Sequence, residues 1–184
     1  SFFNNIISMK YLKYIIFFSL TFSEYLIDES KSKVMYYGNH PLHSWVGKTS
    51  SIMIKSECKS NNKLNCNFEF RIPFMSFYSG NDNRDSNMLY NVNAFLHPDI
   101  IMTFNDFIIR ELNNIYIKGK LSINGIVREI EIPLNIYAIS ENRYSIQSFF
   151  SISLDEFDIK TPKLLFLSID NDIKIEVSLL VNKI

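Results

Sequence analysis

Arg84 and Asp85 form the adjacent charged pair with the clearest chemical use in this chain of 184 residues. An arginine at the mouth of a cavity could hold a ligand head group, because its planar guanidinium pairs with carboxylates and phosphates through parallel hydrogen bonds. The same residues have a structural use, since Asp85 can cap a short helix while Arg84 holds the preceding loop. We favour the structural role and keep Arg84 as a candidate ligand-binding residue.

The three histidines of the chain, His40, His43 and His97, could be imagined as metal ligands. His40 and His43 are three residues apart, so in an extended strand their side chains would point to opposite faces. Pro41 makes the segment irregular, and no thiol or carboxylate lies nearby in the sequence. We therefore predict no metal site.

Catalytic motifs are missing from the sequence. It contains no Gly-x-Ser-x-Gly elbow, no phosphate-binding loop and no His-Glu-x-x-His pair. Carboxylates such as Glu129 and Glu131 alternate with isoleucines, which would turn them outward on a strand. The sequence thus predicts a protein that is not an enzyme, with no catalytic residues and no cofactor. An enzyme that acts on a lipid is the least favoured alternative.

The two cysteines, Cys58 and Cys66, flank a polar loop between apolar segments. They could face each other across a hairpin, and a disulfide would form there if their Cα atoms lie within roughly 7 Å. Export to an oxidising compartment would favour such a bond. The alternative is equally compatible with the sequence: two free cysteines packed as small apolar residues at strand ends.

The amino-acid composition limits the classes of protein to which the chain can belong. The chain is 47% hydrophobic and 15% aromatic, with only five glycines and five prolines, which favours packed strands over disorder. Its length suits a single domain with a substantial core. Nineteen basic and nineteen acidic residues give a formal net charge of zero, so no global electrostatic attraction draws it to nucleic acid. We expect no nucleic-acid partner.

The N-terminal segment resembles a signal peptide. A short basic start at residues 9–13 precedes an apolar run from Tyr14 to Phe22, which is too short to span a bilayer of roughly 30 Å as a helix. Cleavage after Ser23 would leave residues 24–184 as one mature domain, with no stable membrane span. We therefore expect a periplasmic or secreted protein. The alternative is that residues 1–23 form a buried N-terminal strand or helix.

Most of the remaining chain shows the period of two that is typical of strands with one buried face. From Cys66 to Phe74, every even position is apolar while Asn67, Glu69 and Arg71 alternate with them. The same alternation recurs at residues 100–104, 115–123, 130–138, 146–154 and 173–181. For the whole chain we expect about eight strands.

Two local signals join these strands. Asn124-Gly125 provides two residues that tolerate positive φ, as a type I′ hairpin requires. One short helix is expected from about Ser86 to Leu96, capped by Asp85 and ended by Pro98. An antiparallel, nearly helix-free chain of this kind favours a sandwich or a closed barrel.

Five ordered landmarks are similar to the YceI-like family. They are a histidine-containing strand, a Ser-Gly-x-x-x-Arg-Asp turn, a short helix ending in proline, a glycine-bounded hairpin and a Phe-x-Ile-x-Leu ending. In this sequence they occupy Gly38 to Gly47, Ser76 to Asp85, Phe95 to Pro98, Gly119 to Gly125 and Phe150 to Ile159. The resemblance runs from about Val34 to Val181. The cysteine pair is not part of it.

The resemblance implies an all-β, extended lipocalin-like antiparallel barrel of about eight strands with one short helix. It also implies an amphiphilic ligand, a long isoprenoid or a quinone-like lipid held in the barrel, in an exported protein that can form a homodimer. The expected function is therefore to bind and to carry or store such a lipid.

A barrel of this size is either filled by its own side chains or open enough for one small ligand. Gly119 and Ser148 remove bulk from faces that otherwise carry large residues, and Trp45 would plug the barrel or line its rim. The predicted ligand-binding residues are Trp45, Met53, Phe70, Phe74, Met102, Phe104, Phe150, Ile152 and Arg84. The alternative is an exported structural or adhesion module whose core is filled by these side chains.

Overall fold

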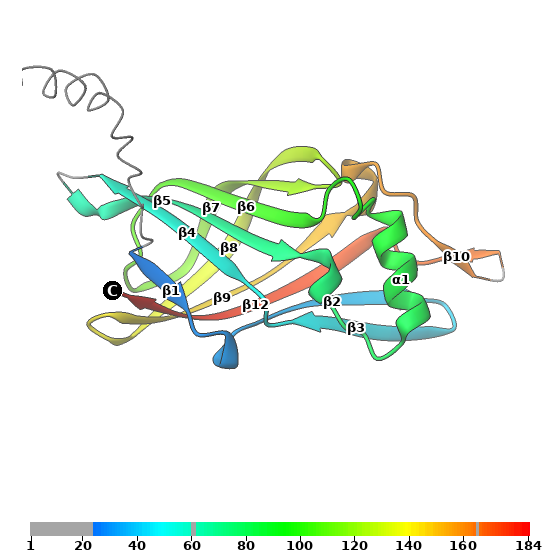
Figure 1. The fold of residues 1–184 in the computed structure, drawn as a ribbon, viewed down its shortest axis with the longest axis horizontal. Helices are drawn as coiled ribbons and strands as arrows, with labels where there is room; N and C mark the ends of the chain where they lie inside the picture. Colours follow the sequence, from blue (N-terminus) through cyan, green and yellow to red (C-terminus); the bar gives the residue numbers. More distant parts are fainter. Residues whose placement is uncertain (1–23, 60–61, 165) are drawn as a thin grey trace, which may run out of the picture.

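The computed structural model describes residues 24–59, 62–164 and 166–184, so the expected leader and its cleavage site lie outside the described residues. Strands dominate the described chain, with one α-helix and three short 3₁₀ helices (Figure 1). The strands are β1 Tyr25–Ile27, β2 Lys33–His40, β3 His43–Thr49, β4 Met53–Lys59, β5 Asn62–Pro73, β6 Asp99–Phe107, β7 Leu112–Ile123, β8 Ile126–Ser140, β9 Arg143–Ser153, β10 Lys163–Leu164, β11 Leu167–Ser168 and β12 Asp172–Lys183. The helices are η1 Glu29–Lys31, η2 Phe74–Ser76, α1 Asp82–Asn91 and η3 Leu154–Phe157.

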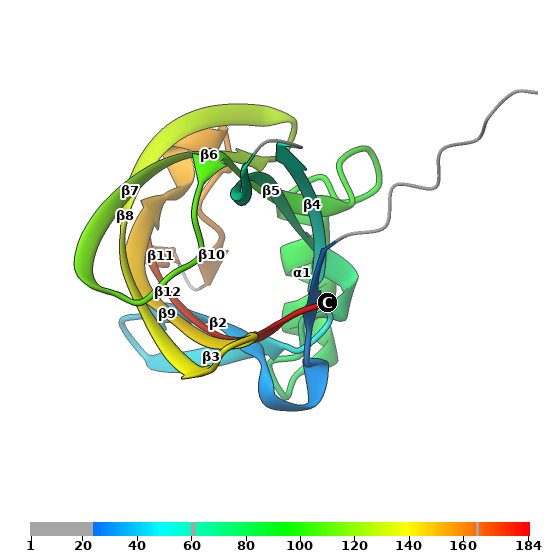
Figure 2. The ribbon, with the colours of Figure 1, turned by 90° about the vertical axis from the view of Figure 1, so that its left-hand side faces the viewer.

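Ten of the described strands form one antiparallel sheet in the order β3-β2-β12-β9-β8-β7-β6-β5-β4, with β1 paired to β12. The sheet curls around an interior, as the view along the barrel shows (Figure 2). The all-β, lipocalin-like expectation is confirmed. The strand count is higher than eight because β1, β10 and β11 have only two or three residues, too few to show a period of two.

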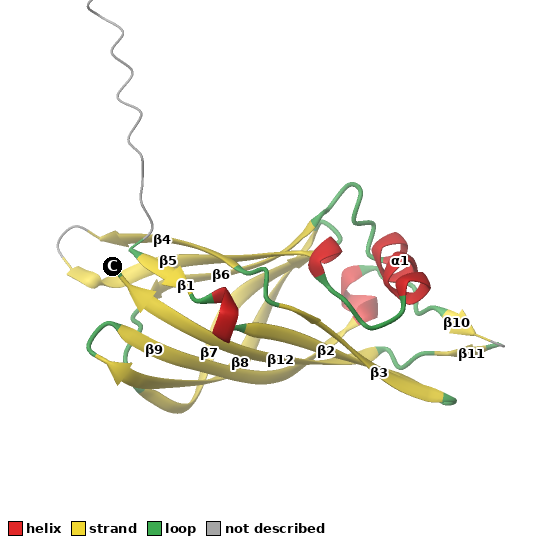
Figure 3. Ribbon diagram, turned by 60° about the horizontal axis from the view of Figure 1, so that its bottom comes forward, coloured by secondary structure: helices red, strands yellow, loops and turns green. Residues whose placement is uncertain are grey.

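Hydrogen bonds between strands do not close the curled sheet in the described chain, because β3 and β4 are the two ends of the sheet order. The space between them is covered by other contacts. β1 lies beside β4, where the Glu24 backbone N–H donates to Ser56 Oγ at 2.9 Å. Lys48 at the β3 edge pairs with Tyr78 through two backbone hydrogen bonds of 3.0 Å. The molecule is a curled half-barrel whose seam is closed by loops, β1 and α1 (Figure 3).

Alternating residues build this wall as the sequence predicts. Phe68 is buried and its neighbour Asn67 is exposed, and the same alternation continues along β7 and β8. These two strands are joined by a two-residue turn in which Asn124 has φ 52° and Gly125 has φ 72°. The predicted type I′ hairpin is confirmed, because both residues take the positive φ that this turn requires.

One end of the barrel is filled by its own side chains. Tyr25, Phe68, Ile136 and Val181 are each at most 2% exposed, and the Tyr25 and Phe68 rings meet edge to face with centroids 5.2 Å apart. They belong to a buried cluster that also contains Cys66. We refer to these four residues with Cys66 as the packed end. It lies near β1 and the C-terminus, opposite to α1 (Figure 1).

Cys58 and Cys66 are partners across the β4–β5 hairpin and are joined by a disulfide bond. The structure thus decides between the two possibilities that the sequence left open. The bond ties together the two strands at the edge of the sheet, at the packed end.

The one α-helix begins earlier than expected. α1 runs from Asp82 to Asn91, and its N-cap is Asn81, whose side-chain oxygen accepts a hydrogen bond from the Arg84 backbone N–H at 2.9 Å. The prediction that Asp85 caps a helix over residues 86–96 is therefore wrong. The Asp85 carboxylate instead accepts hydrogen bonds from the backbone N–H and the hydroxyl of Ser79, so it fixes the loop before the helix.

Replacing Asn81 by alanine should lower the free energy of unfolding by about 1 kcal/mol, because it removes the side-chain acceptor at the start of α1. In a domain of this size the melting temperature should fall by roughly 2–4 °C. Thermal unfolding followed by circular dichroism measures the change. Asn83→Ala is the matched control, since Asn83 is exposed within the helix and should leave the melting temperature almost unchanged. Equal melting temperatures for the two variants would contradict the capping role.

Candidate functional site

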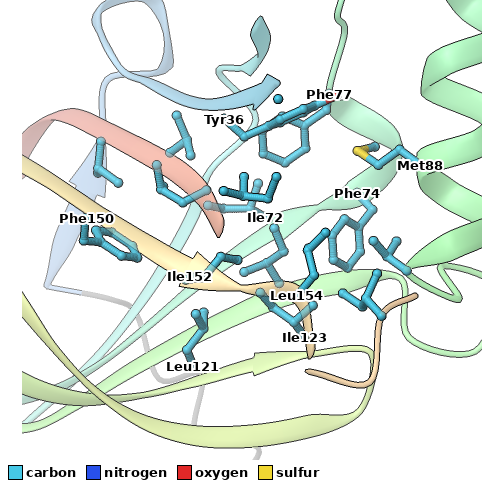
Figure 4. A pocket seen from close by; sticks show the side chains of 18 of the residues that line it. Tyr36, Ile72, Phe74, Phe77, Met88, Leu121, Ile123, Phe150, Ile152 and Leu154 are labelled. Carbon is cyan, nitrogen blue, oxygen red and sulfur yellow. The ribbon is translucent and has the colours of Figure 1, made fainter. Parts of the chain in front are cut away.

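A cavity of about 580 Å³ occupies the part of the barrel that the packed end leaves free. It begins at the end of the barrel where α1, the β2–β3 turn and the β10–β11 ribbon gather, and it extends inward to Leu134, Ile146 and Leu179. Aliphatic and aromatic side chains make up most of its wall, as the close view shows (Figure 4). Its volume lies within the range typical of sites for small organic ligands.

Eight of the nine predicted ligand-binding residues line this cavity. They come from four strands, from the 3₁₀ helix η2 and from α1, so residues far apart in sequence share one wall. The eight are Trp45, Phe70, Phe74, Arg84, Met102, Phe104, Phe150 and Ile152.

Met53 is the exception, and its prediction is wrong. Its side chain is 47% exposed and does not line the cavity. On β4 the inward positions are those of Ile54 and Ser56, while Met53 shares the outer face with Lys55 and Glu57. Because successive side chains of a strand point to opposite faces, the two charged neighbours already indicated that Met53 faces outward.

Two small residues make room in the wall, as predicted. A Cβ atom placed on Gly119 would lie 2.7 Å from Met102 Cε and 2.8 Å from Phe104 Cε1, so only glycine lets these side chains lie across the strand. Ser148 lines the cavity, is buried, and donates its hydroxyl hydrogen to the Pro133 carbonyl oxygen at 2.6 Å. Its hydroxyl is hydrogen-bonded, so Ser148 presents a small surface to the cavity and no unpaired donor.

Sequence reasoning missed several lining residues, and Tyr36, Phe77 and Met88 are the most informative of them (Figure 4). Met88 lies within the segment predicted as a helix, and Phe77 lies in an irregular segment that shows no period of two. Tyr36 stands in β2, directly across from Gly47 in β3. A Cβ atom on Gly47 would lie 2.1 Å from the Tyr36 ring, so the ring lies flat over this glycine.

Trp45 repeats this arrangement two residues along the same hairpin. It pairs with Gly38, and its ring covers that glycine, where a Cβ atom would lie 2.2 Å from two ring carbons. Two aromatic rings therefore cover two glycines on the inner face of the β2–β3 hairpin. Packing an aromatic ring over a cross-strand glycine fixes both the ring and the register.

Burial raises the pKa of the Tyr36 hydroxyl above its ordinary value. The Trp45 N–H, which faces this hydroxyl, and the Arg84 guanidinium act in the opposite direction, while Asp85 adds to the increase. The Tyr36 oxygen and the Trp45 nitrogen are both buried, and neither makes a well-oriented hydrogen bond within the described chain. The cavity wall thus carries two buried polar atoms that face each other and lack a well-oriented partner in the described chain.

Arg84 reaches this pair from α1. Its Nε donates to Ser79 Oγ at 2.8 Å and its Nη2 to the Ser79 carbonyl oxygen at 2.6 Å, which confirms that it holds the preceding loop. Its guanidinium carbon also lies 5.2 Å from the centroid of the Trp45 ring. A cation over an indole face is held by the ring quadrupole. The loop-holding role therefore places the guanidinium on the cavity wall.

His40 and His43 lie side by side, which corrects the expectation that they face opposite ways. They are register partners at the end of the β2–β3 hairpin, with ring centroids 5.5 Å apart, because the two residues between them form a turn. Both line the cavity entrance, while His97 lies against Gly125. Within the described residues, no group of three His, Cys, Asp or Glu side chains is placed to hold a metal ion.

Among the helices of the described chain, none has the length and apolar character needed to cross a membrane.

Three solved structures share this fold at low sequence identity. BcnA of Burkholderia cenocepacia is 17% identical, with a TM-score of 0.68 over 84% of this chain and 99% of that protein. A polyisoprenoid binding domain from Saccharophagus degradans is 13% identical, with a TM-score of 0.73 over 89% of this chain and 100% of that domain. The YceI protein of Campylobacter jejuni is 15% identical, with a TM-score of 0.57 over 75% and 84% of the two chains.

No curated protein sequence matches the chain. A model of the YceI-like domain matches residues 25–181, which include the whole cavity wall and all of the curled sheet except the last two residues of β12. The landmarks quoted from the sequence lie within this match. The chain belongs to the YceI-like family.

Proposed function

We propose that this protein binds a long, apolar, isoprenoid-like lipid in the barrel and carries or stores it. The observation that carries the proposal is the cavity of about 580 Å³, with a mostly apolar wall and an opening at one end. The Saccharophagus degradans domain, which has the same fold, is named for polyisoprenoid binding. Membership of the YceI-like family supports the same class of ligand.

The affinity would come from the tail. Burial of each methylene contributes about 0.8 kcal/mol, so a tail of roughly fifteen carbons contributes about 12 kcal/mol before costs. Association itself costs an estimated 4–15 kcal/mol, and ordering of a flexible chain adds to that. Short ligands should therefore bind weakly, and useful affinity needs a tail that fills most of the cavity.

The open interior argues against an exported structural or adhesion module, since such a module would gain stability by filling its core. An enzyme that acts on a lipid has no observation in its favour. The S. degradans neighbour is named for binding rather than for a reaction.

Export is part of the proposal. The Cys58–Cys66 disulfide supports it, because such bonds persist in oxidising compartments and are rare in the cytosol. The leader-like residues 1–23 support it as well. Intact mass of the protein recovered from the periplasm or the medium tests this: a mature form beginning at Glu24 is the expected result, and a cytosolic protein that keeps its leader would overturn it.

Native mass spectrometry after gentle purification tests lipid binding. We expect a co-purifying lipid of one or a few discrete masses, which denaturation releases. The delipidated protein should then take up one added molecule of a C20 to C40 isoprenoid alcohol. A protein that stays unliganded both after purification and after incubation with these alcohols would overturn the proposal.

A further inference from the structure

The cavity wall has an uneven charge. The chain as a whole has a formal net charge of zero, yet the charged residues in the described wall are Arg84 and Lys163, both cationic. No aspartate or glutamate belongs to this wall. Both cations stand at the open end, on α1 and on the β10–β11 ribbon (Figure 1). A ligand group that rests there meets positive charge that the wall itself does not neutralise.

Arg84 keeps hydrogen-bonding capacity for a ligand. Its contacts with Ser79 use Nε and Nη2, which leaves other guanidinium N–H groups free of recorded partners in the described chain. It forms no ion pair with a described carboxylate. The neighbouring Asp85 is engaged by the backbone and hydroxyl of Ser79. The Ser79 hydroxyl therefore lies between the Arg84 guanidinium and the Asp85 carboxylate and contacts both, which orients the guanidinium without a direct ion pair.

Tyr36 and Trp45 add two neutral donors beside this cation. The indole N–H can only donate, and the tyrosine hydroxyl can donate. Both atoms are buried without a well-oriented partner in the described chain, and it is unfavourable to leave a buried polar group unpaired. Gly38 and Gly47 hold the two rings flat on the inner face, so the donors cannot turn to solvent without breaking this packing. An acceptor supplied by a ligand would satisfy both.

We propose that Tyr36, Trp45 and Arg84 form a head-group subsite that selects amphiphiles with an anionic, acceptor-rich head, a carboxylate or a phosphate. This rests on the proposed function, because the subsite acts on a lipid whose tail lies in the cavity. The guanidinium pairs with the anion, and the indole N–H and phenol O–H donate to its oxygens. Exposed amides of α1, such as Asn83 and Asn87, line the adjacent rim, where the outer part of the head stays in water.

The test compares four ligands that share one geranylgeranyl chain and differ only in the head: carboxylic acid, phosphate, alcohol and amine. Trp45 is the single tryptophan of the chain, so its fluorescence reports occupancy of the subsite directly. The delipidated protein is titrated at pH 7.5 below the micelle concentration of each ligand, and native mass spectrometry gives the stoichiometry. We expect at least one of the two anions to bind about 10-fold or more tightly than the alcohol, and the amine to bind most weakly.

Variants distinguish the contribution of the head group to affinity from that of the tail. Arg84→Met should reduce the ratio of anion affinity to alcohol affinity about 10-fold, to about one, and Arg84→Lys should restore part of the preference. Tyr36→Phe, which removes one oxygen, should weaken anion binding a few-fold and serves if Arg84→Met fails to fold. Lys118→Met is the matched control, since it removes an exposed cation on β7 that does not line the cavity.

The outcomes are distinguishable. If all four ligands bind equally, or if Arg84→Met and Tyr36→Phe keep the full anion preference, the subsite is overturned while the proposed lipid binding stands. If none of the four binds, the proposed function itself is overturned. A preference for phosphate alone or for carboxylate alone supports the subsite and identifies which anion it takes.

Discussion

A variant with Phe104 replaced by aspartate should lose uptake of long isoprenoids, with affinity at least about 100-fold below that of the natural protein. Phe104 is 8% exposed, lines the cavity and meets the Phe70 ring edge to face at 6.1 Å. An unpaired carboxylate there costs several kcal/mol to bury, and each 1.4 kcal/mol is a factor of ten in affinity. Native mass spectrometry with a C20 isoprenoid alcohol measures the loss.

The neighbouring exposed residue provides the control. Asn105→Asp places the same charge on the same strand, facing solvent, and should bind as the natural protein does. Because Phe104→Asp also threatens the fold, far-UV circular dichroism accompanies each titration. Ile152→Trp is the uncharged companion: it adds bulk at a half-buried cavity position and should weaken long tails more than short ones. Normal uptake by both folded variants would show that lipid does not occupy this cavity.

Reducing the Cys58–Cys66 bond should lower the free energy of unfolding by about 2.5 kcal/mol. The sequence separation of 8 closes a short loop, and the chain-entropy relation gives this value for a loop of that size. For a domain of this length, the melting temperature should fall by roughly 5–10 °C. Thermal unfolding with and without a reductant measures the shift.

Lipid affinity should hardly change on reduction, because neither cysteine lines the cavity and the bond ties the opposite end of the barrel. The double variant Cys58→Ser, Cys66→Ser should melt near the reduced natural protein and ignore the reductant. A natural protein whose melting temperature does not respond to the reductant would argue that the bond adds no stability.

The sheet could be predicted from the sequence because each strand carries its own pattern. Phe68 and Phe70 face the interior for the same local reason, alternation with polar neighbours, and no distant contact is needed to see it. Met53 shows that an apolar residue type alone does not place a strand residue in the interior; its position in the alternation must also be considered. It is as apolar as Met102, yet Lys55 and Glu57 share its face and place it outside.

The helix start was harder to predict, since Asn81, Asp82 and Asp85 are all acceptable caps. Asp85 is engaged by Ser79, and the residue before Ser79 is held by the Tyr78–Lys48 backbone pair, a contact between distant segments. Likewise, His40 and His43 come together only because a turn replaces the expected strand. Local sequence does not contain either constraint.

The positions of Tyr36 and Trp45 on the cavity wall could have been predicted in part. Tyr36 with Gly47 and Gly38 with Trp45 are the cross-strand partners of a hairpin with a two-residue turn, so a correct register predicts both rings on glycines. The void itself could not be predicted. Whether apolar side chains from strands far apart meet or stop short of one another depends on packing over the whole barrel, and alternation is identical in both cases.

The packed end dictates an order of events for any lipid held inside. Because Tyr25, Phe68, Ile136 and Val181 fill the barrel beside β1, a lipid enters the cavity from the opposite end, where residues of α1 and Lys163 line the wall. The tail must go in first and come out last, so no lipid is threaded through from one side to the other. A partner that delivers or receives such a lipid would contact the same face of the protein in both cases. It would also contact the head of the bound lipid before its tail.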